Sequence, residues 1–397
     1  MGDTRVVLLG GPRQAGKSTL AQAAVGQGPG VLSFTLDDQA VRAATEADPL
    51  GFVARGAPTM IIDEVQRVPR LGDAIKQVVD QDQRPGQFLL TGSASLETIP
   101  MLAQALVGRL EPLTVYPFSQ GELAGDREDF IDRMFGGGPD LNFVSRLVRA
   151  EYISRAVQGG YPEVVQRAPG RRRSRWFASY VTTLIQRDLT AVAHLHRLAD
   201  IPAFLRLVAA RATAPLNFTA LGRDANMPKD TANRWVTLLQ QLYLVRLTPA
   251  WYNNQTSRAS QSPRLHLVDT GLCAYLAGVN EQSFDQPTMD PGWLLENFVA
   301  MELVKQLGWS DIEVELYHFR TRDGLEVDCV LEALDRRVFG IEVKSAMTVG
   351  GADFRGLRVL ANAAGKNFVG GAVLYTGRTT LSFGDGLWAI PISALWA

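Results

Sequence analysis

The segment from Gly11 to Thr19 constrains this chain more than any other part of its sequence. It reads GPRQAGKST and directly follows a short apolar run, VVLLG, at residues 6–10. It matches the phosphate-binding pattern G-x-x-x-x-G-K-[ST] at every fixed position, in a strand–loop–helix context. Glycines let backbone N–H groups curl around a phosphate, and the following helix points its positive end at the anion. The motif predicts a nucleotide-binding domain.

The charged and hydroxyl residues inside this segment predict binding of ATP together with Mg²⁺. Lys17 is expected to bridge the β- and γ-phosphates, and Ser18 is expected to ligate the metal. We expect the other nucleotide contacts to come from Gly11, Gly16 and Thr19. A chance glycine turn before a helix is the alternative, and the strand–loop–helix context argues against it.

Four more apolar runs follow in the first 140 residues, separated by helical patterns such as residues 70–82. This alternation implies an α/β domain with a largely parallel sheet covered by helices. Glycines at 136–138 and then Pro139 mark a boundary, so we expect an ATPase domain over residues 1–140. The runs are VLSFTL at 31–36, TMIIDEV at 59–65, QFLLTGS at 87–93 and LEPLTVYPF at 110–118.

Acidic and hydroxyl residues close two of these runs. Asp63 and Glu64 end one run, and ligands of a parallel sheet bind at the carboxyl edge of its strands. Asp63 is expected to hold Mg²⁺ through water, and Glu64 to polarise the attacking water. Thr91 and Ser93, after the next run, are candidates to bond the γ-phosphate or that water. A solvated loop and an ordinary polar turn are the alternatives.

Gly108 and Arg109 precede the run that we expect to form a strand over Leu110–Tyr116. This order resembles that of the AAA+ ATPases, in which an arginine at this point reaches the γ-phosphate of a neighbouring subunit. The resemblance implies that Arg109 acts in trans on the transition state, and that the active form is a homo-oligomer. A plain surface arginine is the alternative.

Residues 141–260 have a mostly helical pattern, and part of them resembles a winged helix-turn-helix. Thr219 is positioned to cap a short helix ending at Asn226, Met227 and Pro228 make a turn, and a longer helix covers Lys229–Leu242. In such folds the second helix enters the major groove of DNA, although many winged helices serve only for packing or protein contacts. The expected DNA-facing residues are Lys229, Asn233 and Arg234. Apolar spacing also predicts helices over Phe143–Val157, Trp176–Val192 and Thr231–Leu244.

Five arginines lie within nine residues just before Trp176 and Tyr180. Such a cluster fits phosphate contacts, with the aromatic rings stacking on splayed bases. The exposed start of a helix, with both rings packed in a core, fits equally well. The arginines are Arg167, Arg171, Arg172, Arg173 and Arg175.

Residues 261–397 form a third block with an α/β pattern of its own. Alternation over residues 324–331 puts Glu326 and Asp328 on one face of a strand. Residues 338–344 repeat the pattern, and pairing the two strands as a hairpin brings together Asp328, Glu342 and Lys344. The expected helices are Trp293–Leu307 and Gly351–Ala364, and the expected strands include Glu315–Arg320 and Ala372–Tyr375.

Two carboxylates at one point suit a hard cation, Mg²⁺ or Mn²⁺, which polarises a phosphodiester and lowers the pKa of bound water. A neighbouring lysine can orient that water or neutralise developing charge. This order of residues resembles the PD-(D/E)XK nuclease superfamily, and the resemblance implies that Glu296 completes the metal site. The proline that usually precedes the nuclease aspartate is replaced by Val327. An ion-pair ladder, or a nuclease-like fold that only binds, stays open as an alternative.

The whole chain resembles a prokaryotic family that joins an AAA-type ATPase to a nuclease-like C-terminal domain. The resemblance rests on the segments named above and on GGYP at 159–162, SPR at 262–264, DTG at 269–271 and LLEN at 294–297. It implies an ATP-dependent, Mg²⁺-requiring DNA-processing enzyme. The rival is a nucleotide-switched DNA-binding or signalling protein with a silent nuclease fold.

Composition limits these functions only weakly. The net charge of −1 is an average over unlike parts, so it does not argue against DNA or RNA as a partner. Two cysteines are too few for a disulfide framework, and no apolar segment approaches 18 residues. With no signal-peptide layout at the N-terminus, we expect a cytoplasmic protein that is not embedded in a membrane.

Overall fold

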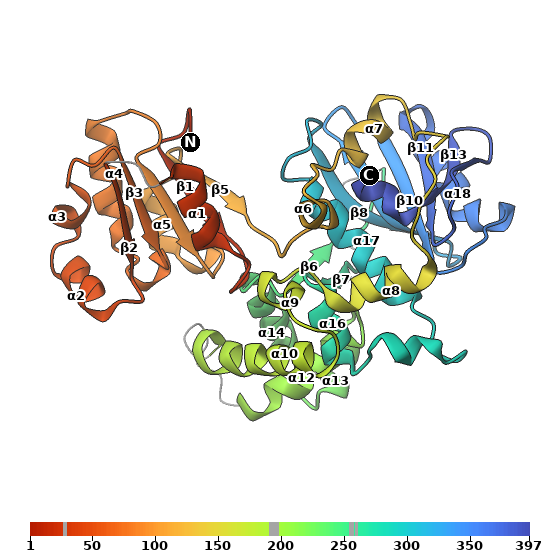
Figure 1. Cartoon of the computed structure of the whole chain (residues 1–397), viewed down its shortest axis with the longest axis horizontal. Coiled ribbons are helices and arrows are strands. Elements are labelled where there is room, and N and C mark those ends of the chain that lie inside the picture. Colours follow the sequence, from red (N-terminus) through yellow and green to blue (C-terminus); the bar gives the residue numbers. More distant parts are fainter. Residues whose placement is uncertain (27–29, 190–197, 254–257, 259–260) are drawn as a thin grey trace. The chain divides into compact units, whose positions relative to one another are not determined.

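The computed structural model describes residues 1–26, 30–189, 198–253, 258 and 261–397 (Figure 1). The chain divides into two compact units. The first unit contains Met1–Pro117 and Thr237–Leu244, and the second contains Phe118–Val236 and Val245–Ala397. The three domains expected over residues 1–140, 141–260 and 261–397 stay predictions. No helix within the described ranges is long and apolar enough to cross a membrane.

The first unit contains a five-stranded sheet in the order β2-β3-β4-β1-β5, with every pair of neighbours parallel. The predicted parallel sheet is therefore confirmed. The last strand ends at Thr114 rather than at Tyr116. The strands are β1 (Val6–Gly10), β2 (Val31–Thr35), β3 (Thr59–Asp63), β4 (Phe88–Gly92) and β5 (Leu110–Thr114).

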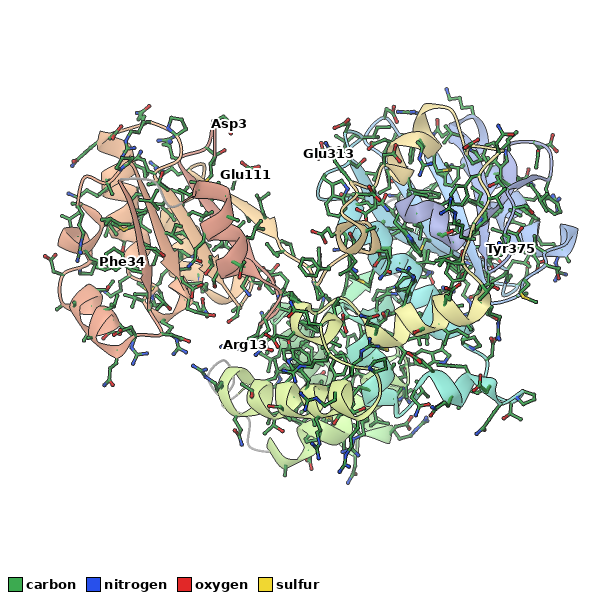
Figure 2. All side chains as sticks on the ribbon, viewed as in Figure 1. Asp3, Arg13, Phe34, Glu111, Glu313 and Tyr375 are labelled. Carbon is green, nitrogen blue, oxygen red and sulfur yellow. The ribbon has the colours of Figure 1, made fainter. Side chains whose placement is uncertain are left out.

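Apolar side chains cover both faces of this sheet because successive strand residues point to opposite faces. Val7, Leu9 and Leu89 belong to one cluster, which includes Ala21 of helix α1. Val6 and Leu8 belong to the other cluster, with buried residues of α4 and with Phe52 of α3. The ring centroids of Phe52 and Phe34 lie 5.0 Å apart. Phe34 is labelled in Figure 2. The helices are α1 (Lys17–Val25), α2 (Gln39–Ala47), α3 (Pro49–Val53), α4 (Leu71–Gln81) and α5 (Pro100–Ala105).

The second unit begins with a largely helical part. Its helices are α6 (Gln120–Ala124), α7 (Phe130–Gly136), α8 (Arg149–Gln158), α9 (Pro162–Val165), α10 (Arg171–Thr183), α12 (Ile201–Ala209), α13 (Phe218–Asp224), α14 (Lys229–Gln241, whose last residues belong to the first unit), α16 (Thr270–Ala277) and α17 (Gly292–Gln306). Strands β6 (Val245–Thr248) and β7 (Arg264–Leu267) form an antiparallel pair.

Two helix predictions in this part are wrong at their ends. The helix expected from Phe143 begins only at Arg149, because Val144 forms a β-bridge with Thr379 and the Ser145 N–H donates to the carbonyl of Arg378. The helix expected over residues 176–192 is α10, which starts five residues earlier and ends at Thr183. A turn of π-helix follows over Leu184–Leu189, and residues 190–192 lie outside the described part of the chain.

The C-terminal part contains a six-stranded mixed sheet in the order β12-β13-β11-β10-β9-β8. Strand β9 pairs antiparallel with β10, so the predicted hairpin is confirmed, while β10, β11 and β13 run parallel. Helix α18 (Arg355–Ala364) packs Leu357 and Leu360 against Gly340, where a Cβ would lie under 3 Å from both leucines. The strands are β8 (Val314–Arg320), β9 (Glu326–Ala333), β10 (Val338–Lys344), β11 (Phe368–Tyr375), β12 (Leu381–Ser382) and β13 (Leu387–Pro391).

Candidate functional site

The predicted phosphate-binding loop lies between β1 and α1. The Lys17 side chain is buried, and its ammonium donates to the carbonyls of Gly11 and Pro12 at 3.0 and 2.8 Å. Gly11 has a φ of 151°, and a Cβ there would lie 2.1 Å from the Val115 carbonyl oxygen, so only glycine fits. Gly16, with a φ of 93°, precedes α1, and Thr19 is exposed in the first turn of that helix.

Hydroxyl groups from three elements converge on Asp63 at the carboxyl edge of the sheet. The Ser18 hydroxyl donates to Oδ1 at 2.8 Å, and the Thr91 hydroxyl donates to the same oxygen. The Thr35 hydroxyl donates to Oδ2 at 3.2 Å. Thr35 was not predicted as a site residue, although it ends β2 at the same edge as Asp63, and that shared position was the available signal.

Glu64 follows Asp63 in the left-handed backbone region, with a φ of 58°, which is uncommon for a residue other than glycine. Its Oε2 accepts hydrogen bonds from the Ser93 hydroxyl at 3.1 Å and from the Gln66 amide. The Gln66 amide also donates to Ser93 at 3.1 Å. Glu64 is therefore oriented by two neighbours, of which sequence reasoning had assigned a role only to Ser93.

The residues around Asp63 fit a nucleotide-bound Mg²⁺. Ser18 and Asp63 already lie within hydrogen-bond distance of each other beside the loop that is expected to hold the phosphates. A hydroxyl and a carboxylate are oxygen ligands that Mg²⁺ accepts, either directly or through water. The bound ion would neutralise charge on the β- and γ-phosphates.

Arg109 lies away from the predicted nucleotide contacts of its own chain. Its guanidinium forms a bidentate pair with Asp80 of α4, with Nε–Oδ1 and Nη2–Oδ2 distances of 2.5 and 2.9 Å. These bonds lower the pKa of Asp80. The role of Arg109 in a neighbouring subunit stays a prediction, and it requires release from Asp80.

The region expected to form a winged helix contains α13, α14 and the pair β6–β7. The first helix is capped by Asn217, whose side chain accepts from the Ala220 N–H at 3.0 Å, so the prediction of Thr219 as the cap is wrong. Asn217 precedes the helix in an extended conformation, which suits a capping side chain. The predicted DNA contacts Lys229, Asn233 and Arg234 are all exposed on α14.

The aromatic residues after the arginine cluster belong to a core. Trp176 and Tyr180 are buried, and their rings stack with centroids 5.1 Å apart. Tyr161 packs against both rings. These rings are thus not presented to a base, whereas Arg171, Arg172 and Arg175 are exposed.

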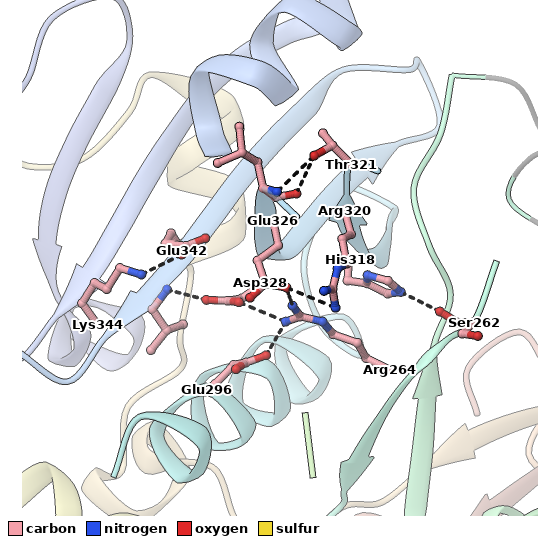
Figure 3. A network of polar contacts seen from close by, with 12 residues as sticks. Ser262, Arg264, Glu296, His318, Arg320, Thr321, Glu326, Asp328, Glu342 and Lys344 are labelled. Atoms are coloured by element: carbon pink, nitrogen blue, oxygen red, sulfur yellow. Dashed lines mark hydrogen bonds and ion pairs between the residues drawn. The ribbon is translucent and has the colours of Figure 1, made fainter. Parts of the chain in front are cut away.

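The C-terminal sheet brings together the predicted carboxylates and lysine (Figure 3). The Lys344 ammonium lies 2.8 Å from Oε1 of Glu342, and the Val343 N–H donates to Oδ2 of Asp328 at 2.9 Å. Glu296 reaches the same cluster from α17. Burial, followed by the charge of Asp328, raises the pKa of Glu342 to about 8, although Lys344 opposes this shift.

The expected alternation along β9 holds for Glu326 and Asp328, which both accept hydrogen bonds from Arg264 of β7, but it is wrong from Cys329 onward. Tyr317 of β8 pairs with Val330 and Phe319 pairs with Val327, so Asp328 and Cys329 both lie opposite His318. This is a β-bulge, which re-aims side chains at sheet sites. As a result Val330, rather than Cys329, packs in one cluster with Val327. Asp328 and Glu342 are both buried.

Arg264 of β7 is a residue of this cluster to which sequence analysis assigned no role. It is 2% exposed and forms ion pairs with Glu296, Glu326 and Asp328. Burial alone would lower the pKa of Arg264, but the charges of these acids outweigh it and raise the pKa. Arg264 belongs to the SPR segment at residues 262–264, which carries part of the family resemblance, but the spacing of polar and apolar residues does not place it near residues 296–342.

The cluster as it stands does not fit a divalent metal ion. Within the described ranges, no group of three or more His, Cys, Asp or Glu side chains has an arrangement that could hold one. The positive guanidinium of Arg264 already bonds the carboxylates predicted to be ligands. Each of the three acids predicted to bind a metal is therefore paired with a basic side chain. Glu296 and Asp328 pair with Arg264, and Glu342 pairs with Lys344.

Three regions of the chain match described families. Residues 3–124 match the family described as an AAA domain, residues 149–283 match a domain of unknown function, DUF8612, and residues 291–395 match another, DUF4143. The N-terminal region is thus AAA-type and nucleotide-binding, which agrees with the predicted phosphate-binding loop.

Two mycobacterial proteins are similar along most of the chain. They are "Uncharacterized protein Rv2008c" of Mycobacterium tuberculosis and "Uncharacterized protein Mb2031c" of Mycobacterium bovis, each 27% identical over 86% of this chain and 71% of its own length. Among solved structures, Can2 from Sulfobacillus thermosulfidooxidans in complex with cyclic tetra-adenylate aligns over 99% of this chain and 97% of its own, with 10% identity and a TM-score of 0.22. At that TM-score the likeness carries no argument about fold or function.

Proposed function

We propose that this chain hydrolyses ATP and uses its nucleotide state to control nucleic-acid binding by the rest of the chain. The observation that carries the proposal is the convergence of Ser18 and Thr91 on Asp63 beside the loop of Lys17, with Glu64 held next to it. The match of residues 3–124 to an AAA domain supports the nucleotide as its ligand.

Each residue of this group has a defined task in the proposed reaction. Lys17 exchanges its carbonyl partners for phosphate oxygens, and Ser18 and Asp63 hold Mg²⁺. Glu64 accepts a hydrogen bond from the attacking water and orients it for in-line attack. Thr91 and Ser93 bond the γ-phosphate or that water, while Gln66 fixes the carboxylate of Glu64.

Control of nucleic-acid binding rests on the exposed basic residues of the second unit. Lys229 and Arg234 lie on α14, and Arg171, Arg172 and Arg175 lie on or near the start of α10. Exposed arginines and lysines of this kind bind phosphate groups without reading sequence. Assembly into a homo-oligomer, with Arg109 reaching a neighbour's nucleotide, is part of the same proposal.

The direct test is phosphate release from ATP by the full chain and by Lys17→Ala, with and without DNA or RNA. We expect hydrolysis that requires Lys17 and changes when nucleic acid is added. Absence of hydrolysis would overturn the proposed ATPase activity. A hydrolysis rate that neither DNA nor RNA changes would favour action on a protein partner.

Metal-dependent DNA cleavage by the C-terminal domain is the second candidate, favoured by the grouping of Asp328, Glu342 and Lys344. Incubating linear duplex and single-stranded DNA with Mg²⁺ or Mn²⁺, with and without ATP, tests it. Cleavage that survives Lys344→Ala would remove the site from the candidate. Arg264 argues for the binding function, because it bonds the acids that cleavage would need free.

A further inference from the structure

The carboxylate cluster of the C-terminal sheet contains a cation that belongs to the chain itself. One guanidinium nitrogen of Arg264, Nη1, donates to two carboxylates, those of Glu296 and of Asp328, the latter at 3.0 Å. The other, Nη2, donates to Glu326 at 2.7 Å. Figure 3 shows the guanidinium surrounded by these acids.

Both carboxylate oxygens of Asp328 already accept hydrogen bonds. Oδ1 accepts from Arg264, and Oδ2 accepts from the Val343 N–H at 2.9 Å. A metal ion bound there would lie close to a buried positive charge, and the repulsion is strong where little water screens it. By contrast, Oε2 of Glu342 is buried and has no hydrogen-bond partner among the described residues.

The main chain of Arg264 is held by ordered structure on both sides. Arg264 pairs with Thr248 in the β6–β7 ladder and forms a bridge with Pro215. Nearby, the Leu216 N–H donates to the Pro263 carbonyl at 2.8 Å, and Nε2 of His318 lies 3.1 Å from the Ser262 carbonyl oxygen. The backbone of Arg264 is therefore fixed by a strand, so its side chain loses little further conformational entropy when it binds the acids.

We propose that Arg264 takes the place of a metal ion in this nuclease-like cluster, and that removing it exposes a latent site for Mg²⁺ or Mn²⁺ formed by Glu296, Asp328 and Glu342. A guanidinium has no open coordination position and activates no water. With Arg264 in place the cluster holds its strands together and binds no divalent ion. The proposal does not depend on ATP hydrolysis.

The test is the melting temperature of the full-length chain without nucleotide, with and without about 1 mM MnCl₂, a concentration at which a site of micromolar affinity is saturated. The variants are Arg264→Gln, Asp328→Asn and the double variant. Arg258→Gln is the matched control, because Arg258 is a partly buried arginine paired with Glu332 in the same sheet, away from the cluster.

We expect Mn²⁺ to raise the melting temperature of Arg264→Gln by roughly 5 °C. In the wild type and in Arg258→Gln, Mn²⁺ should shift the melting temperature no more than it does in Asp328→Asn. The double variant should lose the shift seen in Arg264→Gln. A wild-type shift that Asp328→Asn removes would overturn the proposal, as would a folded Arg264→Gln without a shift. If Arg264→Gln does not fold, Mn²⁺ titration of the wild type against Asp328→Asn decides: equal binding supports the proposal, and a site lost with Asp328 overturns it.

Discussion

The Ser18 hydroxyl donates a hydrogen bond to Asp63 at 2.8 Å, although 45 residues separate the two in the chain. The contact joins the phosphate-binding loop to the acidic end of β3, as the sequence predicts for a strand end beside that loop. It brings the two side chains that are expected to hold Mg²⁺ within hydrogen-bond distance of each other.

Replacing Lys17 by alanine should weaken ATP binding by about 10- to 100-fold, the usual effect of removing a charged hydrogen-bond donor. The ammonium also bonds the carbonyls of Gly11 and Pro12, so its loss removes contacts within the loop as well as the expected contact with phosphate. Titration with a fluorescent ATP analogue measures the change. Lys76→Ala, an exposed lysine on α4, is the control. Unchanged affinity in Lys17→Ala would contradict the assigned site.

Replacing Glu64 by glutamine should leave ATP binding within about twofold and slow hydrolysis by about 100-fold or more, the range for loss of a general base. The amide keeps the shape of the side chain and its place beside Gln66 and Ser93 but cannot accept a proton. Single-turnover phosphate release separates binding from chemistry. Glu46→Gln, on the exposed surface of α2, should behave as wild type. Normal turnover in Glu64→Gln would show that another group activates the water.

Mixing Arg109→Ala chains with Lys17→Ala chains should restore part of the ATPase activity that each variant lacks alone. In a mixed assembly, an intact Arg109 from one chain can act on an intact phosphate-binding loop of another. Arg109 must leave Asp80 before it can reach a neighbouring chain. The single variant Asp80→Asn should therefore hydrolyse ATP faster than the wild type. Activity in the mixture no higher than the average of the two variants would indicate that Arg109 serves only its pair with Asp80.

The grouping of Lys17, Ser18 and Asp63 could be predicted because their motifs carry both chemistry and position. Lys17 and Ser18 follow β1, and Asp63 ends β3. These strands run parallel, so their ends lie at one edge of the sheet, and the sequence pattern alone predicted the proximity. Periodicity within a segment predicted the wrong helix ends where that segment pairs with residues far away in the sequence. The bridge from Val144 to Thr379 replaced the first turns of an expected helix.

Arg264 shows the same limit at the second site. It lies 64 residues before Asp328, and no periodicity connects β7 to β9. The bulge in β9, which puts Val330 rather than Cys329 on the face of Val327, depends on pairing with β8 and is invisible in a regular alternation of polar and apolar residues. The grouping of the acids could therefore be predicted from the sequence, whereas the position of Arg264 among them is known only from the structure.

His266, the neighbour of Arg264 two residues along β7, should make the native state sensitive to acid. It is buried, and its ring nitrogens have no hydrogen-bond partner among the described residues. Burial, then the charge of Arg264, lowers the pKa of His266 to about 3, against about 6.5 when unfolded. Above pH 6.5 the ring is neutral in both states. Below it only the unfolded chain takes up the proton, so His266 costs the native state about 1.4 kcal/mol for each pH unit down to pH 3.

The effect of His266 must be read as a difference between two proteins, because carboxyl groups with raised pKa values, such as Glu342, act in the opposite direction as the pH falls. In His266→Gln those groups remain and only the histidine contribution disappears. The free energy of unfolding of the variant, measured in urea, should therefore gain on that of the wild type by about 1.2 kcal/mol between pH 6 and pH 5. A difference that stays constant over this interval would mean that the buried ring accepts its proton in the folded state.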